Sequence, residues 1–406
     1  MNSRRAFRRA LILMALGSSL AAVGAHAQTK RYGPGASDTE IRIGQAAPYS
    51  GPASAYGAIA KVIAAHFRKV NDEGGVNGRK ITLISLDDGF SPPKTVEVVR
   101  RLVEQENVLF VHTIGTPTSG AVQKYLNANK VPQLFVSSGA TKWGDYKNFP
   151  WTIGFNATYQ TEGTVYARYL LREKPSARIA VLYQNDDFGK DLLAGFKAGL
   201  GDKAKSMIVA EQSYELTDAT ISSQLITLQG SGADTLLDLT TPKFAAMAIR
   251  KLAEVGWKPL HILGNVSSSV GSVLTPAGLE NSAGIISSAY TKDPTDSAWA
   301  NDPGMVEWRA FMKKYYPEGS LEDWINVYSQ AMAQSMVQVL KQAGDDLTRE
   351  NVMRQAANLK GLELPGLLPG IRIDTSPTDY YPIGSLRMAR FDGKHWVLFG
   401  DVIGAK

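Results

Sequence analysis

Cysteine is absent from all 406 residues of the sequence. The chain therefore forms no disulfide bond, and it lacks the residue on which bacterial lipoproteins carry a thioether lipid anchor. A chain of this length is large enough to rest on hydrophobic cores alone, and on two domains rather than one. Beyond residue 27 no segment approaches about 20 uninterrupted apolar residues, so we expect a protein that is not embedded in a membrane.

The motifs of common catalytic and nucleotide-binding sites are also missing. The sequence contains no G-x-x-x-x-G-K-[ST] loop, no G-x-G-x-x-G and no G-x-S-x-G, which argues against nucleotide binding and hydrolase chemistry. No two histidines have the H-x-x-x-H spacing of a metal site. They are His26, His66, His112, His261 and His395. We therefore predict no enzyme activity, no metal site and no cofactor.

The remaining polar groups have ordinary structural explanations. His112, near the end of an expected strand, either faces a cleft or is a hydrogen-bonded core histidine, and the second is favoured. The acidic pairs at 87–88 and 186–187 stand at strand ends, where turn and cap roles are commoner than acid–base catalysis. The serines at 267–269 have no histidine or acid close by in the sequence, which argues against a nucleophile.

The first 27 residues have the pattern of a secretory signal peptide. Four arginines lie within residues 4–9, an apolar run covers 10–23, and Ala-His-Ala closes the segment at 25–27. We expect cleavage after Ala27 and export to the periplasm by the general secretory route. The sequence SRRAF at 3–7 leaves the twin-arginine route as the alternative.

The net charge of +6 comes mostly from that segment. Residues 1–27 hold four arginines and no acid, which leaves 40 Lys+Arg against 38 Asp+Glu, a net charge of +2. No basic run with interleaved aromatic residues occurs, so we expect no nucleic-acid partner.

Residues 41–88 set the fold class. An alternating strand pattern at 41–44 is followed by a loop of small residues, a helical pattern, a Gly-Gly stop and a second strand at 80–86. This order predicts a right-handed βαβ unit. Ligands of open α/β sheets bind beyond the carboxyl ends of the strands. Tyr56, on the first such loop, is therefore a candidate ligand-binding residue.

The alternation of strands and helices then continues in two series. We predict an α/β protein with two doubly wound parallel-sheet lobes that are joined by a hinge of crossing segments. The expected division is lobe 1 at 28–153, lobe 2 at 154–286, a helical return to lobe 1 at 287–360, and an extended segment crossing back to lobe 2 at 361–406. Ligands prefer clefts at such domain interfaces, and hinge closure around them is common.

Two strand-end loops are rich in hydroxyl groups. GTPTS at 115–119 follows the third expected strand, and SSGAT at 137–141 follows the fourth. Backbone N–H groups and hydroxyls at a helix start are suited to an anion such as a carboxylate. Plain capping of the following helix, with Ser119 as the cap, explains the first loop equally well. Both interpretations stay open at this point.

A series of short motifs runs in order along the chain. They are APYSGPA at 47–53 with YG at 56–57, VN at 70–71 with GGVNG at 74–78, DD at 87–88 with PK at 93–94, and FG at 188–189. This series resembles the branched-chain amino-acid transport binding proteins, the type I periplasmic substrate-binding proteins of ABC importers. The similarity covers most of the chain after residue 27. It implies two α/β lobes that close on a small molecule bearing a carboxylate.

The resemblance also implies ligand contacts, position by position. In the family, the loop matching 115–119 supplies a hydroxyl to the ligand carboxylate, here from Thr116 or Thr118. Tyr56 matches an aromatic wall of the first lobe. Phe188 stands in for a second-lobe tyrosine without its hydroxyl, and Thr241 falls where another tyrosine is usual. In the family, another loop contributes a backbone contact and a threonine hydroxyl to the ligand, and it matches Ser138, Gly139, Ala140 and Thr141 here.

Two departures from the family bear on the ligand. Val266 aligns with the acid that pairs with the ligand ammonium in amino-acid binders, and Asn156 replaces an expected aspartate in the crossover loop. A buried ammonium without an anionic partner costs several kcal/mol, enough to abolish micromolar binding. We therefore predict a carboxylate with an apolar or aromatic body and no ammonium. In the alternative, Asp187 or Glu162 takes over the ammonium and the ligand is a branched-chain or other amino acid.

The function that follows is that of a monomeric receptor that delivers its ligand to the membrane permease of an ABC importer. A periplasmic sensor subunit that reports ligand occupancy is the alternative.

Overall fold

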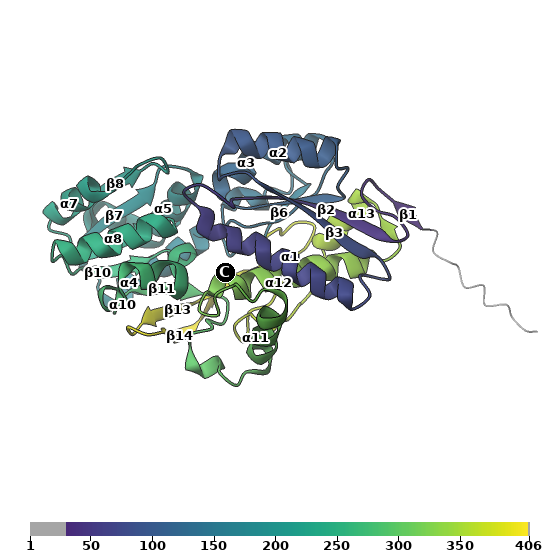
Figure 1. Ribbon diagram of the computed structural model, residues 1–406. Helices are drawn as coiled ribbons and strands as arrows, with labels where there is room; N and C mark the ends of the chain where they lie inside the picture. Colours follow the sequence, from purple (N-terminus) through teal and green to yellow (C-terminus); the bar gives the residue numbers. More distant parts are fainter. Residues whose placement is uncertain (1–29, 405–406) are drawn as a thin grey trace, which may run out of the picture. The chain divides into compact units, whose positions relative to one another are not determined.

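The computed structural model describes residues 30–404, whose main strands form two sheets (Figure 1). The expected signal peptide, with its cleavage site after Ala27, lies outside the described residues. The first sheet has five parallel strands in the order β3-β2-β4-β5-β6. They are β2 (Glu40–Ala47), β3 (Lys80–Asp87), β4 (Phe110–Thr113), β5 (Gln133–Val136) and β6 (Thr152–Gly154).

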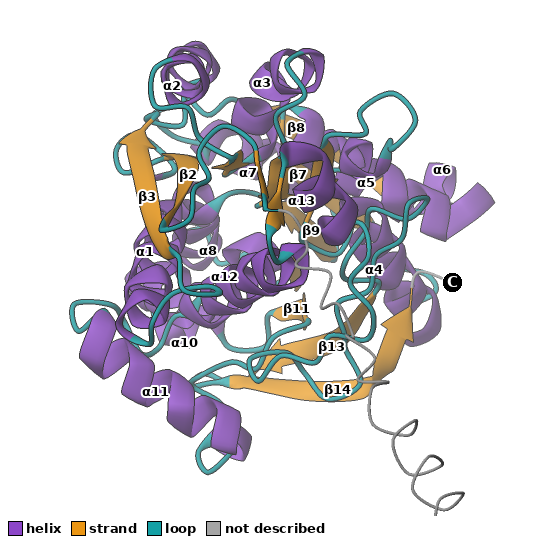
Figure 2. Cartoon of the chain, turned by 90° about the vertical axis from the view of Figure 1, so that its right-hand side faces the viewer, coloured by secondary structure: helices purple, strands orange, loops and turns teal. Residues whose placement is uncertain are grey.

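The second sheet has seven strands in the order β14-β13-β11-β10-β9-β7-β8. Five are parallel, and the C-terminal pair β13 and β14 joins them in antiparallel fashion, beside β11 (Figure 2). The prediction of two parallel-sheet α/β lobes is confirmed, and this antiparallel edge adds to it. The strands are β7 (Ile179–Gln184), β8 (Ile208–Tyr214), β9 (Thr235–Leu239), β10 (Leu260–Leu263), β11 (Ile286–Ala289), β13 (Ser385–Phe391) and β14 (Trp396–Gly404).

Helices cover both faces of the first sheet, because its central strands are apolar on both sides. One face packs against α2 and α3 and the other against α1 and α12. The helices of this lobe are α1 (Gly57–Asp72), α2 (Pro92–Glu104), α3 (Thr116–Ala128), α11 (Pro303–Tyr315), α12 (Trp324–Ala343) and α13 (Arg349–Ala356). A short parallel pair, β1 (Arg31–Tyr32) with β12 (Asp346–Leu347), lies apart from the main sheets and was not predicted.

The second sheet is covered in the same way. Helices α4 and α5 pack on one face, and α7 and α8 pack on the other. The helices of this lobe are α4 (Tyr159–Glu173), α5 (Asp187–Leu200), α6 (Ala204–Met207), α7 (Ser222–Gly230), α8 (Pro242–Glu254), α9 (Thr275–Ala277) and α10 (Leu279–Ser282). Within residues 30–404, no helix combines the length and the apolar character needed to cross a membrane.

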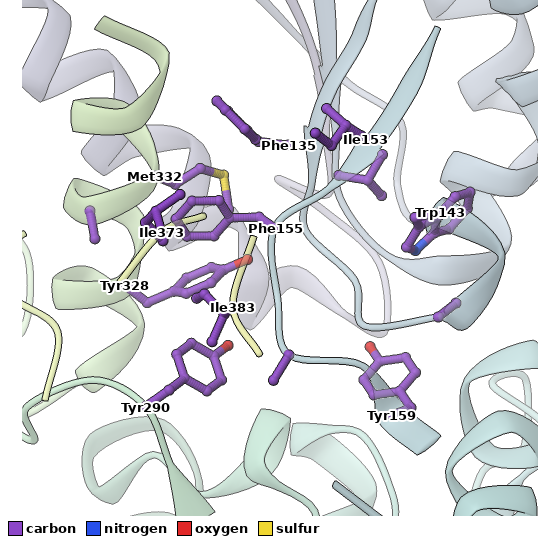
Figure 3. Packing of buried hydrophobic residues seen from close by; sticks show 14 of the residues in the cluster. Phe135, Trp143, Ile153, Phe155, Tyr159, Tyr290, Tyr328, Met332, Ile373 and Ile383 are labelled. Carbon is purple, nitrogen blue, oxygen red and sulfur yellow. The ribbon is translucent and has the colours of Figure 1, made fainter. Parts of the chain in front are cut away.

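The chain crosses between the two sheets at residues 155–158, 290–302 and 374–384. Aromatic side chains bind these crossings to the first lobe. The ring of Phe155, on the first crossing, packs edge-on against Phe135 and Tyr328, each with centroids 5.6 Å apart (Figure 3). Ile383, on the third crossing, lies beside Tyr328 in the same cluster (Figure 3). The apolar core therefore continues through the crossings, next to the site described below.

Candidate functional site

A cavity of about 540 Å³ lies between the carboxyl ends of the two sheets. Its first-lobe wall includes Tyr56, Phe90, Ile114, Thr116 and Ser137. Its second-lobe wall includes Tyr159, Gln184, Phe188, Thr241 and Val266. Asn156 on the first crossing and Trp324, Ile325 and Tyr328 on α12 complete it.

The cavity brings together six of the eleven residues predicted as ligand contacts. These six are Tyr56, Thr116, Asn156, Phe188, Thr241 and Val266. The other five are close in the sequence to lining residues but do not line the cavity themselves. They are Thr118, Ser138, Gly139, Ala140 and Thr141.

The predicted loop 115–119 is in fact the first turn of α3. The helix begins at Thr116, with Gly115 before it in a left-handed conformation at φ 92°. Ser119 does not cap the helix; its hydroxyl is buried without a hydrogen-bond partner. The helix therefore starts within the loop expected at 115–119 rather than after it, because Pro117 fits its first turn.

The two threonines of this turn have different surroundings. The Thr116 hydroxyl lies 2.7 Å from the Ser138 hydroxyl, which also accepts a hydrogen bond from the Trp143 indole at 2.9 Å. The Thr118 hydroxyl donates to the Ile114 carbonyl behind it. Of the two, Thr116 is the one that faces the cavity.

Helix N-termini surround the cavity, since the wall lies where strands end and helices begin. Thr116 opens α3, Tyr159 opens α4, Trp324 opens α12, and Thr241 directly precedes α8. Such ends carry a partial positive charge and unpaired N–H groups. Among the residues that the structure describes, none that lines this cavity has a charged side chain. Side chains cap α4 and α12, through Thr158 and Asp323, whereas no side chain caps α3 or α8. The wall is therefore neutral in side chains, and the starts of α3 and α8 are the places where its backbone favours an anion.

Three tyrosines add hydroxyl groups to those of the serine and threonines in the wall. Burial raises the pKa of Tyr159 to about 12 and the pKa values of Tyr56 and Tyr328 still further, so all three are neutral at physiological pH. The Tyr328 hydroxyl donates to the Asn156 side-chain oxygen at 2.6 Å. The Tyr56 hydroxyl reaches the Val266 carbonyl of the other lobe at 3.4 Å, a long and weak contact.

A second-lobe network fixes Thr241 and Gln184. The Gln184 side-chain oxygen accepts from the Tyr214 hydroxyl at 2.9 Å and from the Thr241 hydroxyl at 3.0 Å. The Tyr214 hydroxyl in turn accepts from the Thr241 backbone N–H at 3.0 Å. This network orders the end of β7 and the start of α8, so both residues meet the cavity in a fixed geometry.

Five further residues line the cavity without having been predicted as ligand contacts: Phe90, Tyr159, Gln184, Trp324 and Tyr328. Gln184 could have been predicted, because it is the last residue of β7 and ligands of such sheets bind beyond the carboxyl ends of the strands. Trp324 and Tyr328 reach the site from a late helix, and no local pattern marks them.

The two acids considered as partners for an ammonium do not line the cavity. Asp187 is exposed and pairs with Lys142 at 2.8 Å. Glu162 is buried, and its carboxylate accepts from the Asn265 backbone N–H at 2.7 Å and from the Tyr166 hydroxyl at 2.8 Å. Burial raises the pKa of Glu162 to about 7.

Two polar contacts join the lobes beside the cavity, and we call them the rim contacts. In the first, the Thr141 N–H and hydroxyl donate to the Asp191 carboxylate at 2.8 and 2.6 Å, and Gln160 donates to the same carboxylate at 2.7 Å. The second is the pair of Lys142 with Asp187. Thr141 comes from the first lobe and Asp191 from α5 of the second, so these contacts hold the lobes together.

The other polar groups singled out in the sequence have structural partners. His112 is buried between Gln45 and Ser137, at 3.1 and 3.0 Å, and burial lowers its pKa to about 3, so it is a neutral core histidine. Asp87 accepts from the backbone of Ser50 and Gly89 and so shapes the loop before Tyr56. Ser267 donates to the Thr240 carbonyl. Within residues 30–404 no cluster of side chains has the make-up of a metal site.

Known proteins share both the sequence pattern and the fold. A Leu/Ile/Val-binding protein homolog of Brucella suis biovar 1 is 28% identical over 324 residues, which cover 78% of this chain and 82% of that protein. A branched-chain amino-acid ABC transporter protein of Thermus thermophilus, solved with bound valine, has a TM-score of 0.80 at 16% identity and covers 90% of this chain and 97% of that one. A fatty acid ABC transporter substrate-binding protein of Thermomonospora curvata has a TM-score of 0.76 at 21% identity, covering 93% and 95%.

The family described as periplasmic binding protein matches residues 40–395, almost the whole described chain. This match confirms the resemblance drawn from the short motifs. The chain therefore belongs to the periplasmic binding protein family, with the type I fold of the branched-chain amino-acid binding proteins.

Proposed function

We propose that this protein is the solute receptor of an ABC importer and that it binds a small carboxylate with an apolar or aromatic body and no ammonium. One observation carries the proposal: the cavity between the lobes has no charged side chain on its wall, yet helix N-termini surround it. A carboxylate needs donors, which the start of α3 and the Thr116 hydroxyl offer. An ammonium needs an anion, and the wall supplies none.

The wall also suits an apolar body. Tyr56, Phe90, Phe188 and Trp324 present aromatic rings, and the Phe188 ring packs edge-on against Tyr159 at 5.0 Å. Benzoate-type acids and short aliphatic acids match this combination of an anion site with an aromatic surround.

An amino-acid ligand is the second candidate, and the names of the relatives favour it. The Brucella proteins are called Leu/Ile/Val-binding protein homologs, and the Thermus structure holds valine. The fatty acid protein shares the fold and is named for a carboxylate without an ammonium. In this chain the uncharged residue Val266 lines the cavity, whereas Glu162 does not line it and is held by Asn265 and Tyr166. This arrangement supports the acid over the amino acid.

Binding would act by closing the two lobes. A ligand that touches Thr116 in the first lobe and Thr241 or Phe188 in the second favours the closed state over the open one. The closed receptor then docks on its membrane permease in the periplasm, after export by the N-terminal signal peptide. A sensor role would use the same closure, and a neighbouring permease and ATPase operon would favour transport.

The test is a thermal-shift screen followed by calorimetric titration. Ligands that bind only the folded state raise its melting temperature. We expect benzoate-type or apolar acids to raise it and leucine, isoleucine and valine to leave it unchanged. Tight leucine binding with no response to any acid that lacks an ammonium contradicts the proposal. Chemical conversion of a bound ligand on incubation would point to an enzyme instead.

A further inference from the structure

Two buried hydrogen-bond donors beside the cavity have no partner in the protein. The indole N–H of Trp324 and the hydroxyl of Tyr290 are both shielded from solvent and unbonded. The two side chains are only 5% and 2% exposed. A buried donor without a partner costs free energy, so a native structure usually explains each one.

The two donors stand differently toward the cavity, because Tyr290 is not among the residues that line it. Trp324 opens α12 and lines the cavity directly. Tyr290 lies where the second crossing begins and packs edge-on against Trp324 and Tyr328, with centroids 6.3 and 6.2 Å apart. Figure 3 draws Tyr290 close to Tyr328, below Phe155. This aromatic group is a different wall from the start of α3, where Thr116 offers its hydroxyl.

We propose that the ligand carries a second polar group besides its carboxylate, a neutral hydrogen-bond acceptor, which is received by the indole N–H of Trp324, the one of the two donor residues that lines the cavity. This inference rests on the proposed function and narrows its substrate class to acids with a carbonyl, ether or hydroxyl oxygen on the apolar body. An indole N–H only donates. It therefore selects an acceptor and cannot take an ammonium.

A second cavity gives the competing explanation. Trp324 also borders a space of about 360 Å³ whose wall includes Ser288, Thr291 and Asp293. Those groups are acceptors, and a water molecule there could bridge them to the indole. In that case the indole N–H would already be paired, and a polar group on the ligand would not increase the affinity.

The experiment compares pairs of acids that differ only in the acceptor. One pair is para-acetylbenzoate and para-isopropylbenzoate, and the other is an ω-acetyl and an ω-isopropyl alkanoate of equal chain length. The two members of a pair have the same shape. The difference between their affinities, measured by calorimetry on the full mature chain, is therefore the contribution of the carbonyl oxygen. We expect the acetyl member to bind at least about tenfold more tightly, because the isopropyl member leaves the indole N–H unpaired.

Variants then assign the preference to these residues. Trp324→Phe removes the donor residue that lines the cavity and keeps a ring, so it should reduce the preference toward equal binding. Tyr290→Phe removes the donor packed against Trp324, outside the lining, and should reduce the preference less. Trp308→Phe is the matched control, because its indole N–H is also buried and unbonded but lies in the α11 core with Met305 and Met312. The control should keep the full preference.

The outcomes separate this inference from the proposed function. If the wild-type protein binds both members of each pair equally well, the second polar group is not recognised and this inference fails while the carboxylate proposal stands. If Trp308→Phe removes the preference as well, the indole N–H at the cavity is not its cause. If none of these acids binds and leucine does, the proposed function itself is wrong.

Discussion

The cavity wall and the rim contacts both join the two lobes, but they do so with different chemistry. At the rim, charged carboxylates meet donors of the other lobe at 2.6 to 2.8 Å. Across the wall, the direct bond runs between neutral groups, Tyr56 and the Val266 carbonyl, at 3.4 Å. Charges at the exposed rim keep much of their hydration, whereas a charge in the cavity without a partner costs several kcal/mol. The rim therefore favours closure on any ligand, and the wall decides which ligand is bound.

A charge placed in the cavity wall should change ligand affinity more than any other substitution considered below. Val266→Asp puts a carboxylate where the valine side chain meets the cavity. We expect the affinity for the acid ligand to fall by at least about 100-fold, because two like charges at close range repel by several kcal/mol. Weak binding of leucine or valine should appear at the same time. Calorimetric titration with both ligand classes measures the change.

The control for that variant is Val397→Asp on β14, the outermost strand of the second sheet, where the side chain is exposed. It should leave both affinities unchanged. Equal binding of the acid by Val266→Asp and by the wild type would mean that the ligand does not approach this part of the wall.

Glu162, a buried acid that does not line the cavity, allows a second test, through pH. Burial raises the pKa of Glu162 from 4.5 to about 7. The folded state therefore holds this proton more tightly than the unfolded chain, so stability is full below about pH 4.5 and falls as pH rises to about 7. At roughly 1.4 kcal/mol per unit, the loss amounts to about 3 kcal/mol. Glu162→Gln should remove it.

The measurement is the free energy of unfolding of both proteins from pH 4 to 8, taken as a difference because other groups titrate in the same window. Burial raises the pKa of Asp293 to about 6 and lowers the pKa values of His66 and His112 to about 4 and 3. These groups are common to both proteins and cancel. A difference that does not vary with pH would mean that Glu162 stays charged in the folded state.

Features that are local in the sequence could be predicted, whereas contacts between distant segments could not. The fold could be predicted from the alternation of strands and helices, and Tyr56 from its place on a strand-end loop. The other five wall residues that were predicted came from the family resemblance, which the ordered motifs carry. The start of α3 differs from the prediction, since Pro117 suits a loop and a first helical turn equally well and its local sequence does not distinguish the two. Trp324, Tyr328 and the partnership of Thr141 with Asp191 depend on segments far apart in the sequence. Only the folded chain brings them together.

Removing one hydroxyl from the wall should have a moderate effect. Thr116→Val deletes the hydroxyl that lies 2.7 Å from Ser138. We expect the acid to bind about tenfold more weakly, since a hydrogen bond to a charged group contributes roughly 1.5 to 3 kcal/mol. Thr118→Val is the matched comparison. Its hydroxyl serves the Ile114 carbonyl, so that variant should lose stability rather than affinity. The reverse pattern would make Thr118 the residue that contacts the ligand.

The smallest effect is expected at the rim. Asp191→Asn weakens the acceptor that holds the Thr141 N–H and hydroxyl. Contacts of this partly exposed kind contribute up to about 1 kcal/mol, so every ligand should bind up to about fivefold more weakly, with the ratio between acids unchanged. Asp202→Asn, an exposed acid on the same lobe, is the control and should change nothing. Tighter binding of acids alone in Asp191→Asn would contradict this division. It would mean that the ligand carboxylate competes with Asp191 for Thr141, as the family resemblance implied for that threonine.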